Sequence, residues 1–365
     1  MNTFDLIVVG AGIIGASCAD LAAAEGLRVA IVEPGPVGGG ATAASMGHLV
    51  VMDDDPAELA LSRYSQQLWE AYAGLPEAEF SRCGTLWIAR DEREGAGVAA
   101  KIARLAQAGV VAEAVDAQAL YALEPELAPD LAGGMLVAGE AVVYPPRMAE
   151  FLVRRATSRG ARLLLGHRVQ QLAADGVVLD DGTRLSGPVL VATGCALPEL
   201  LPRLPLRARK GHLVITDRYP AFARHQLLEL GYADSAHGNA PVSVAFNVQP
   251  RPTGQVLIGS SREFDTSRQV SMPTVQRMLE RAFTFLPRLR DLQALRIWTG
   301  FRPATPDGRP YLGAVPGLHD VWVAAGHEGL GVTTAFASAH LVIDQFLGRR
   351  CAIDPAPYLP SRVRA

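Results

Sequence analysis

The chain has 365 residues, of which 49% are hydrophobic and 19% are charged. This length and composition provide a core for one large or two ordinary domains and exclude a mainly disordered protein. The 34 basic and 37 acidic side chains leave a formal net charge of −3, so the sequence lacks the basic stripe that nucleic-acid binding requires.

No segment predicts a membrane span or an exported protein. The longest stretch without Asp, Glu, Lys or Arg, Pro34 to Met52, contains prolines and glycines that predict a loop. Asp5 interrupts the first apolar run and no basic segment precedes it, so we expect no secretory signal. The four cysteines form no C-x-x-C pair, which argues against a metal site or a disulfide framework. We expect a cytoplasmic protein, with peripheral attachment to the inner membrane as an alternative.

The first elements in chain order predict a β–α–β unit. Two apolar runs, Leu6–Val9 and Val29–Val32, read as strands, and a helical stretch to about Glu25 lies between them. A third strand does not follow. The Gly-rich segment Pro34–Gly47 comes next, and then a polar helical stretch at Glu58–Tyr72, so the chain leaves this first sheet early.

The middle of the chain alternates strands and helices. The predicted helices cover Val98–Ala108 and Pro146–Ser158, and an Asp181–Gly182 turn predicts a hairpin. The predicted strands are Thr85–Ala89, Arg162–Leu165, Arg168–Ala173, Gly176–Leu179 and Pro188–Ala192.

The block from Leu206 to Arg296 has the alternation of a half-buried antiparallel sheet. Its predicted strands and helix are Gly211–Thr216, Val242–Val248, Gln255–Gly259 and the helix Met272–Phe285. The last block is small, apolar and Gly-rich, and a final helix is predicted from about Gly331 to Leu347.

The clearest motif is G-x-G-x-x-G at Gly10, Gly12 and Gly15, directly after a strand and at the start of a helix. Glycines there allow a pyrophosphate to approach the N–H groups at the helix N-terminus. Glu33, at the end of the next strand, can accept hydrogen bonds from both adenosine ribose hydroxyls, and its charge disfavours NADP. The sequence therefore predicts a dinucleotide site, without deciding between NAD and FAD.

The segment Gly38–His48 bears on that choice, because its small residues let the backbone approach a flat ring closely. The alternative is a flexible linker. A linker would not need the apolar run Leu49–Met52 that follows, so we favour a ring-binding segment.

These motifs, together with three later stretches, resemble the D-amino-acid oxidase/glycine oxidase family of FAD enzymes in order and spacing across the whole chain. The later stretches are Val189–Gly194, Gly300–Pro310 and Ala325–Thr333. Within the family, His327–Gly331 and Phe246–Pro252 most resemble bacterial D-hydroxyproline (D-amino-acid) dehydrogenases and the related hydrogen cyanide synthase subunit.

The resemblance implies an α/β fold in which a Rossmann-like FAD-binding domain is interleaved with an α+β substrate domain built on an antiparallel sheet. The FAD-binding domain would comprise residues 1–75, 143–205 and 295–365. The substrate domain would comprise residues 76–142 and 206–294.

The resemblance also implies which residues bind FAD. Gly10, Gly12, Ile14, Gly15 and Glu33 would hold the ADP half, Val169 would offer its backbone to the adenine, and Thr193 and Gly194 would close the pocket. The residues expected along the ribityl chain and the ring are Thr42, Ser45, Met46, Gly47, His48, Leu49, Gly300, Arg302, Gly326, His327, Gly329, Leu330, Gly331, Val332 and Thr333. A helix starting at these last glycines would direct its positive end at the flavin. A simple helix cap is the alternative reading.

Arg302 is the main candidate for the substrate, because its guanidinium fork matches a carboxylate. A structural salt bridge to a residue such as Asp307 is the alternative. His48 and His327 would border the substrate or the flavin, unless they are hydrogen-bonded core residues, and Tyr232 and His237 are further candidate contacts. Glu328 differs from the bulky or basic residue of glycine-oxidase-like members, which argues against a glycine oxidase.

The implied reaction is hydride transfer from the Cα of a small D-amino or imino acid, such as D-hydroxyproline or D-proline, to flavin N5, with electrons passed to a non-oxygen acceptor. Partner subunits or the respiratory chain would receive them. Residues Gly300–Pro310 contain no cysteine for covalent attachment, so FAD should be non-covalent. The alternatives are a glycine/sarcosine-type oxidase using O2, a non-catalytic FAD-containing subunit, and an NAD-dependent dehydrogenase.

Overall fold

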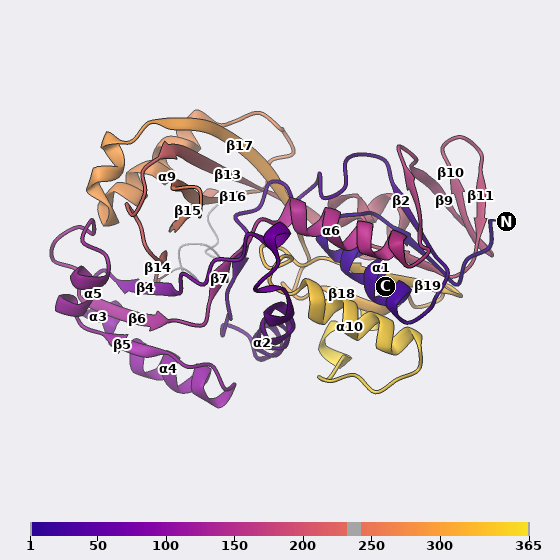
Figure 1. The fold of residues 1–365 in the computed structure, drawn as a ribbon, viewed down its shortest axis with the longest axis horizontal. Coiled ribbons are helices and arrows are strands. Elements are labelled where there is room, and N and C mark those ends of the chain that lie inside the picture. Colours follow the sequence, from indigo (N-terminus) through magenta and orange to yellow (C-terminus); the bar gives the residue numbers. More distant parts are fainter. Residues whose placement is uncertain (1, 232–241, 364–365) are drawn as a thin grey trace.

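The computed structural model describes residues 2–231 and 242–363, and two large sheets organise them. Both appear in Figure 1, the first on the right and the second on the left. The first sheet has six strands in the order β18–β19–β12–β1–β2–β8, all parallel except the β18–β19 pair. Its strands are β1 (Leu6–Val9), β2 (Val29–Glu33), β8 (Arg162–Leu165), β12 (Val189–Val191), β18 (Tyr311–Ala314) and β19 (Val321–Ala325).

Helices cover one face of this sheet and a small sheet covers the other. The helices α1 (Ile13–Ala24), α6 (Pro145–Ser158) and α10 (Ala335–Phe346) share one apolar core with β1 and β2. The opposite face packs against a three-stranded antiparallel sheet. That sheet consists of β9 (Val169–Ala173), β10 (Gly176–Leu179) and β11 (Arg184–Ser186). The central strands β1 and β12 are apolar along their length because both faces are buried.

The second sheet has eight strands in the order β17–β13–β16–β15–β14–β4–β6–β5. The pairs are antiparallel except β14–β4, which are parallel. The strands are β4 (Thr85–Ala89), β5 (Glu113–Val115), β6 (Gly133–Val137), β13 (Arg207–Arg218), β14 (Gln226–Glu229), β15 (Val242–Pro250), β16 (Gln255–Glu263) and β17 (Ala294–Ala304).

Helix α9 (Met272–Phe285) packs on one face of the eight-stranded sheet, where Phe285 stacks on Phe246 of β15 with ring centroids 4.2 Å apart. A two-stranded sheet of β3 (His48–Leu49) and β7 (Ala141–Val142) joins the Gly-rich segment to the chain that follows β6. The remaining α-helices are α2 (Pro56–Trp69), α3 (Glu92–Gly95), α4 (Val98–Gln107), α5 (Ala117–Leu123) and α7 (Leu197–Leu200). Short 3₁₀ helices of the described residues begin at Glu70, Pro76, Gly194, Pro287, Ala356 and Pro360.

Most predicted elements lie within two residues of the observed ones, and two differences matter for the site. The final helix begins at Ala335 rather than Gly331, so Gly331 to Thr334 form turns before it. Strand β17, which the prediction assigned to the FAD-binding domain from residue 295, pairs with β13 from Arg207↔Ala304 to Thr216↔Ala294. The division into two domains stays a prediction.

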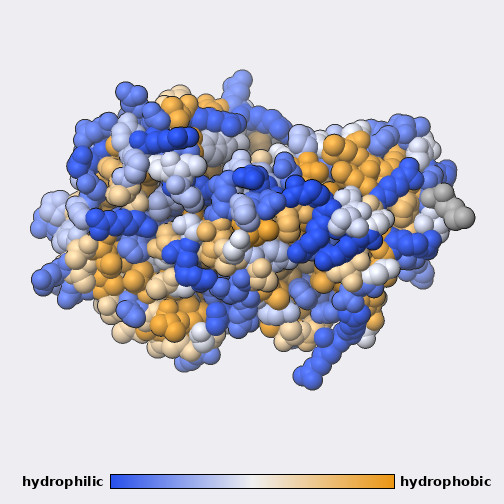
Figure 2. Space-filling model, in the orientation of Figure 1, coloured by the Kyte–Doolittle hydropathy of each residue, from blue (hydrophilic) through white to orange (hydrophobic). Residues whose placement is uncertain are grey.

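Figure 2 shows hydrophilic residues spread over the visible face, with small separate hydrophobic patches between them. No helix in residues 2–231 and 242–363 is long and apolar enough to cross a membrane.

Candidate active site

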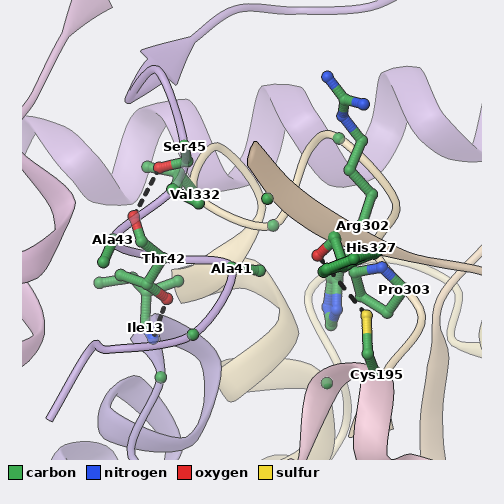
Figure 3. A pocket seen from close by; sticks show the side chains of 18 of the residues that line it. Ile13, Ala41, Thr42, Ala43, Ser45, Cys195, Arg302, Pro303, His327 and Val332 are labelled. Carbon is green, nitrogen blue, oxygen red and sulfur yellow. Dashed lines mark hydrogen bonds between the residues drawn. The ribbon is translucent and has the colours of Figure 1, made fainter. Parts of the chain in front are cut away.

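A cavity of about 890 Å³ lies where the two sheets meet, and three parts of the chain supply much of its lining. The first is the N-terminus of α1 with Glu33 and the loop 39–46. The second comprises residues of β13, β15, β16 and β17, and the third is the turn segment 324–332. In Figure 3, Ile13, Thr42 and Ser45 lie across the cavity from Cys195, Arg302 and His327.

The N-terminus of helix α1 lies at the cavity. Its N-cap residue is Gly12, which has no side chain to accept a hydrogen bond from the first turn. Instead, the Ile13 N–H donates to the Thr42 hydroxyl at 3.0 Å (Figure 3). Gly10 has φ +105°, and an added Cβ would collide with the carbonyl of Ala192. The turn therefore requires glycine, and it leaves the positive end of α1 facing the cavity.

Glu33 ends β2 beside this helix terminus. Its Oε2 accepts from the Ala11 N–H at 2.7 Å and its Oε1 from the Gly35 N–H at 2.9 Å. Each oxygen keeps a second lone pair for a ribose hydroxyl. On the facing strand end, the buried hydroxyl oxygen of Thr193 lines the cavity and has no hydrogen-bond partner in the described chain. A helix N-terminus, a carboxylate and an unsatisfied hydroxyl around one cavity fit an adenine dinucleotide.

The Gly-rich loop is bound to the eight-stranded sheet. The Gln249 side-chain amide donates to the Met46 carbonyl at 2.6 Å, and the Trp298 indole donates to the Ala44 carbonyl at 3.3 Å. Gly300 leaves the space that Ala44 occupies, since an added Cβ there would collide with the Ala44 methyl group. These contacts contradict the flexible-linker alternative and place the loop against the cavity.

His48 uses both of its ring nitrogens within the protein. The Gln226 Nε2 donates to Thr85, so the Gln226 Oε1 faces the ring and accepts from His48 Nδ1 at 2.8 Å. His48 Nε2 then accepts from the Asn247 amide at 3.2 Å. Burial lowers the pKa of His48 to about 4, helped by the charges of Arg302 and Arg262. The ring is neutral at pH 7 and links the loop to β14 and β15.

His327 is neutral for a similar reason. Its Nε2 lies 2.9 Å from the Ser338 hydroxyl of α10, and burial lowers its pKa to about 3. Both histidines line the cavity, as the sequence predicted, but neither takes up a proton near pH 7.

Arg302 lies on β17 and lines the cavity, half-buried. Its Nη1 donates to the Ser261 carbonyl at 2.9 Å, and its guanidinium lies over Gly211, where an added Cβ would collide with Nη1. The alternative of a salt bridge to Asp307 is wrong, because Asp307 pairs with Arg362 at 2.7 Å. The Ser261 carbonyl thus holds the guanidinium beside the cavity, in space that is free because Gly211 has no side chain.

A second charged group stands next to Arg302. Arg262 Nε donates to Glu328 Oε1 at 3.4 Å, and Arg209 lies 3.7 Å from the same oxygen. A Cβ on Gly329 would lie 3.7 Å from the Arg302 stem and 3.8 Å from Arg262, so this glycine lies beside both arginine side chains. Glu328, with φ +46°, is thereby positioned among arginines.

The cavity brings together most of the residues that the sequence nominated and omits four of them. Gly15 lets α1 pack against Gly10, Gly47 approaches the Val143 backbone, Leu49 is in the core, and the Thr333 hydroxyl donates to the His48 carbonyl at 2.9 Å. Tyr232 and His237 lie outside the described residues. The nominated residues that do line it are Gly10, Gly12, Ile14, Glu33, Thr42, Ser45, Met46, His48, Val169, Thr193, Gly194, Gly300, Arg302, Gly326, His327, Gly329, Leu330, Gly331 and Val332.

Sequence reasoning missed several lining residues, among them Glu58, Trp87, Asn247 and Arg262. They come from α2, β4, β15 and β16. Only Asn247 lies in a stretch that carries the family resemblance, Phe246–Pro252, and nothing in that stretch marks its side chain as a cavity residue. The late start of α10 also corrects the expectation that a helix begins at Gly331 beside the ring. Gly326, with φ +88°, and the turns after it form that part of the wall.

The family follows from comparison with known proteins. Residues 5–345 match the family model described as FAD dependent oxidoreductase (DAO). The chain belongs to this family. A glycine oxidase of Pseudomonas aeruginosa is 31% identical over 379 residues, which cover 98% of both chains. A D-amino acid dehydrogenase of Rhizorhabdus wittichii is 31% identical over 74% of this chain and 65% of its own length.

The crystal structure of glycine oxidase from Geobacillus kaustophilus has a TM-score of 0.89 and 27% identity, covering all of both chains. The comparisons confirm the resemblance, the mixed α/β fold with a Rossmann-like FAD-binding part, and the assignment as an FAD-dependent oxidoreductase. The NAD-dependent alternative is therefore wrong.

Proposed function

We propose that this enzyme dehydrogenates a small D-amino or imino acid whose carboxylate is bound by Arg302. The observation that carries the proposal is the half-buried guanidinium on the cavity wall, held by Ser261 and accommodated by Gly211. A planar fork in a site of low dielectric binds a carboxylate bidentately. FAD bound in the cavity would supply the hydride acceptor, and a substrate that loses a hydride from Cα becomes an imine, cyclic for a proline, that water can hydrolyse.

The protein's part is positioning. Arg302 fixes the carboxylate, and apolar side chains on the same cavity, including Met52, Trp87, Leu228 and Leu330, surround the rest of a small substrate. Fixing the two ends of the substrate orients its Cα–H toward the ring-binding side of the cavity. We assign the nominated cavity-lining residues of the Gly-rich segments to FAD, held without a covalent bond, and Arg302 to the substrate.

Within this class we favour a D-hydroxyproline- or D-proline-like substrate and a non-oxygen electron acceptor. Glu328 supports this reading, because it replaces the bulky or basic residue expected of a glycine oxidase and pairs with Arg262. The acceptor would be a partner subunit or the respiratory chain. We also place the protein in the cytoplasm, in keeping with its four free cysteines.

A glycine- or sarcosine-type oxidase that uses O2 is the second candidate. It is favoured by the glycine oxidase of Pseudomonas aeruginosa, which matches along nearly the whole chain. A non-catalytic FAD-containing subunit would share the cavity but would not be reduced by any amino acid.

The test is anaerobic mixing of the purified, FAD-loaded protein with D-hydroxyproline, D-proline, other D-amino acids, sarcosine and glycine, while flavin absorbance is recorded. Bleaching by D-hydroxyproline or D-proline above the others supports the proposal, and preference for glycine or sarcosine supports the second candidate. If none of the compounds lowers the flavin absorbance, both candidate functions are contradicted. Peroxide formation as fast as dye reduction contradicts the non-oxygen acceptor.

A further inference from the structure

The proposed reaction needs a proton acceptor, because an amino acid enters as an ammonium ion and only its neutral amine can release a hydride from Cα. The described titratable groups on the cavity wall, apart from arginines, are Glu33, His48, Glu58, Cys195, Glu199, His327 and Glu328. An acceptor must hold the proton near neutral pH, and it must have a lone pair available.

Three of these groups cannot accept a proton at neutral pH, because the two histidines bind it too weakly and the cysteine thiol already holds its own. His48 and His327 are neutral, with ring nitrogens in hydrogen bonds to other side chains. Burial raises the pKa of the Cys195 thiol to about 11, and its sulfur donates to the Phe301 carbonyl at 3.5 Å. None of the three takes a proton from an ammonium group at pH 7.

Three carboxylates already have partners. Glu33 accepts from the backbone of Ala11 and Gly35, and Glu199 pairs with Arg168 at 3.2 Å. Glu328 pairs with Arg262 and also accepts from the Gly329 N–H at 2.6 Å. The oxygens of these three carboxylates are therefore already engaged by other groups of the protein.

Glu58 differs from all of them. It lies in the first turn of α2, half-buried, and its carboxylate makes no hydrogen bond or ion pair with any described residue. Burial raises its pKa to about 7, with Asp54 and Asp55 of its own segment and Glu328 of the facing turn acting in the same direction. Arg262 of β16 opposes them. Arg262 pairs with Glu328 and lies with Arg302 beside Gly329, so the charges that act on Glu58 from across the cavity are neighbours of Arg302.

We propose that Glu58 pairs with the substrate's ammonium group and takes its proton, while Arg302 holds the carboxylate. In this step an N–H bond breaks, its electron pair remains on nitrogen as the amine lone pair, and an O–H bond forms on the Glu58 carboxylate. No electron is gained or lost. The inference rests on the proposed function and adds to it a catalytic residue and a site built for a zwitterion.

The first test is the pH profile of anaerobic flavin reduction, expressed as the rate constant divided by Kd. The wild type should rise with pH and level off above about pH 7, and Glu58→Gln should keep rising toward the pKa of the free amine. At neutral pH the variant should be slower by about a hundredfold to ten-thousandfold, the range for general acid–base catalysis. Glu58→Asp should restore the plateau in part.

Glu140→Gln is the matched control. Burial also raises the pKa of Glu140 to about 7, but this residue does not line the cavity, so its variant should keep the wild-type plateau. If Glu58→Gln keeps the plateau, or if Glu140→Gln loses it, the inference is wrong.

The second test measures binding to the FAD-loaded protein by calorimetry and needs no turnover. The ligands are 2-aminoisobutyrate, which has no Cα–H, and pivalate, in which a methyl group replaces the amine. Glu58→Gln should weaken 2-aminoisobutyrate about tenfold or more and leave pivalate unchanged. If the ratio of the two ligands' Kd values is the same in the variant as in the wild type, the proposed ion pair between Glu58 and the ammonium group is wrong. If no amino acid reduces the wild-type flavin, the proposed function itself fails.

Discussion

The two sides of the cavity are built in different ways. The cofactor wall, formed by the N-terminus of α1, Glu33 and the loop 39–46, comes from one stretch of chain and presents mainly backbone groups. The substrate wall, formed by cavity-lining residues of β13, β15, β16 and β17, presents side chains from strands far apart in the sequence. A wall that presents backbone groups requires glycines at fixed spacing in the sequence. A wall that presents side chains requires only that the strands carrying them pair in the sheet.

This difference explains where charge is placed. On the cofactor wall, the one carboxylate, Glu33, is fixed by two backbone N–H groups. On the substrate wall, Arg302 is fixed by a carbonyl of β16 and by the missing side chain of Gly211 on β13. Substitutions in the two walls should therefore have separate effects. A substitution in the cofactor wall should lower the affinity for FAD, whereas one in the substrate wall should leave FAD bound and lower the affinity for the substrate.

The largest effect is expected from Glu33→Ala on the cofactor wall. Two hydrogen bonds that the ribose hydroxyls donate to a charged acceptor, together about 3–6 kcal/mol, are lost, so FAD affinity should fall by at least a hundredfold. The measurement is the ratio of flavin to protein after desalting, with thermal unfolding as the check that the fold persists. Full FAD occupancy in the purified variant would contradict the assignment.

Arg302→Ala should have the next largest effect, on the substrate wall. Loss of a buried charged partner typically costs about 2–5 kcal/mol, which lowers kcat/KM by about thirtyfold to several thousandfold. Arg302→Lys keeps the charge but loses the planar fork, so its kcat/KM should lie between those of the wild type and Arg302→Ala. FAD should stay bound in both variants. An unchanged kcat/KM in Arg302→Ala would mean that the carboxylate is held elsewhere.

The cofactor wall could be predicted from sequence, because its signals are local. Gly10, Gly12, Gly15 and Glu33 occur within one β–α–β unit, and their order alone fixes their geometry. The strands β1, β4, β8 and β10 likewise have the predicted bounds, since short apolar runs between turn residues leave little freedom.

The substrate wall could not be predicted in the same way. Asn247 and Arg262 reach the cavity only because β15 and β16 pair across the sheet with Asn247 opposite Gly259. Glu58 reads as an ordinary first-turn acidic residue of an amphipathic helix. Arg302 could be nominated because its guanidinium fork matches a carboxylate, but its neighbours Ser261 and Gly211 cannot be identified from the sequence.

A subtler way to damage the substrate wall is Gly211→Ala. The backbone at Gly211 is not in the left-handed region, but an added Cβ would collide with the Arg302 guanidinium and with the Ser261 carbonyl oxygen that accepts from it, so both must shift. A forced shift of this kind typically costs about 1–3 kcal/mol, so carboxylate affinity should fall by roughly fivefold to a hundredfold while FAD stays bound. Gly139→Ala, where an added Cβ meets no atom within 4 Å, is the control. Equal ligand affinities in the two variants would contradict the role of Gly211.

The smallest effect concerns a carboxylate behind the substrate wall. Glu140 is fully buried and accepts from the Val51 N–H at 2.7 Å, and burial raises its pKa from 4.5 to about 7 in spite of Lys101 nearby. The folded state therefore binds the proton more tightly than the unfolded state, so unfolding between these two pKa values releases it. Stability from this group is fully present below about pH 4.5 and declines as pH rises toward about pH 7.

Glutamine does not titrate, so Glu140→Gln removes this group's contribution to the pH dependence of unfolding. The glutamine side chain still offers an oxygen to the Val51 N–H. The wild type should lose about 1 kcal/mol more unfolding free energy than the variant between about pH 6 and about pH 8. Urea unfolding of the two proteins at both pH values measures the difference. Parallel pH dependence would show that Glu140 does not titrate in this range, whereas a steeper decline in the variant would reverse the sign of the argument. Because Glu140 does not line the cavity, the difference should be the same with and without FAD, unlike the effects of Glu33 and Arg302.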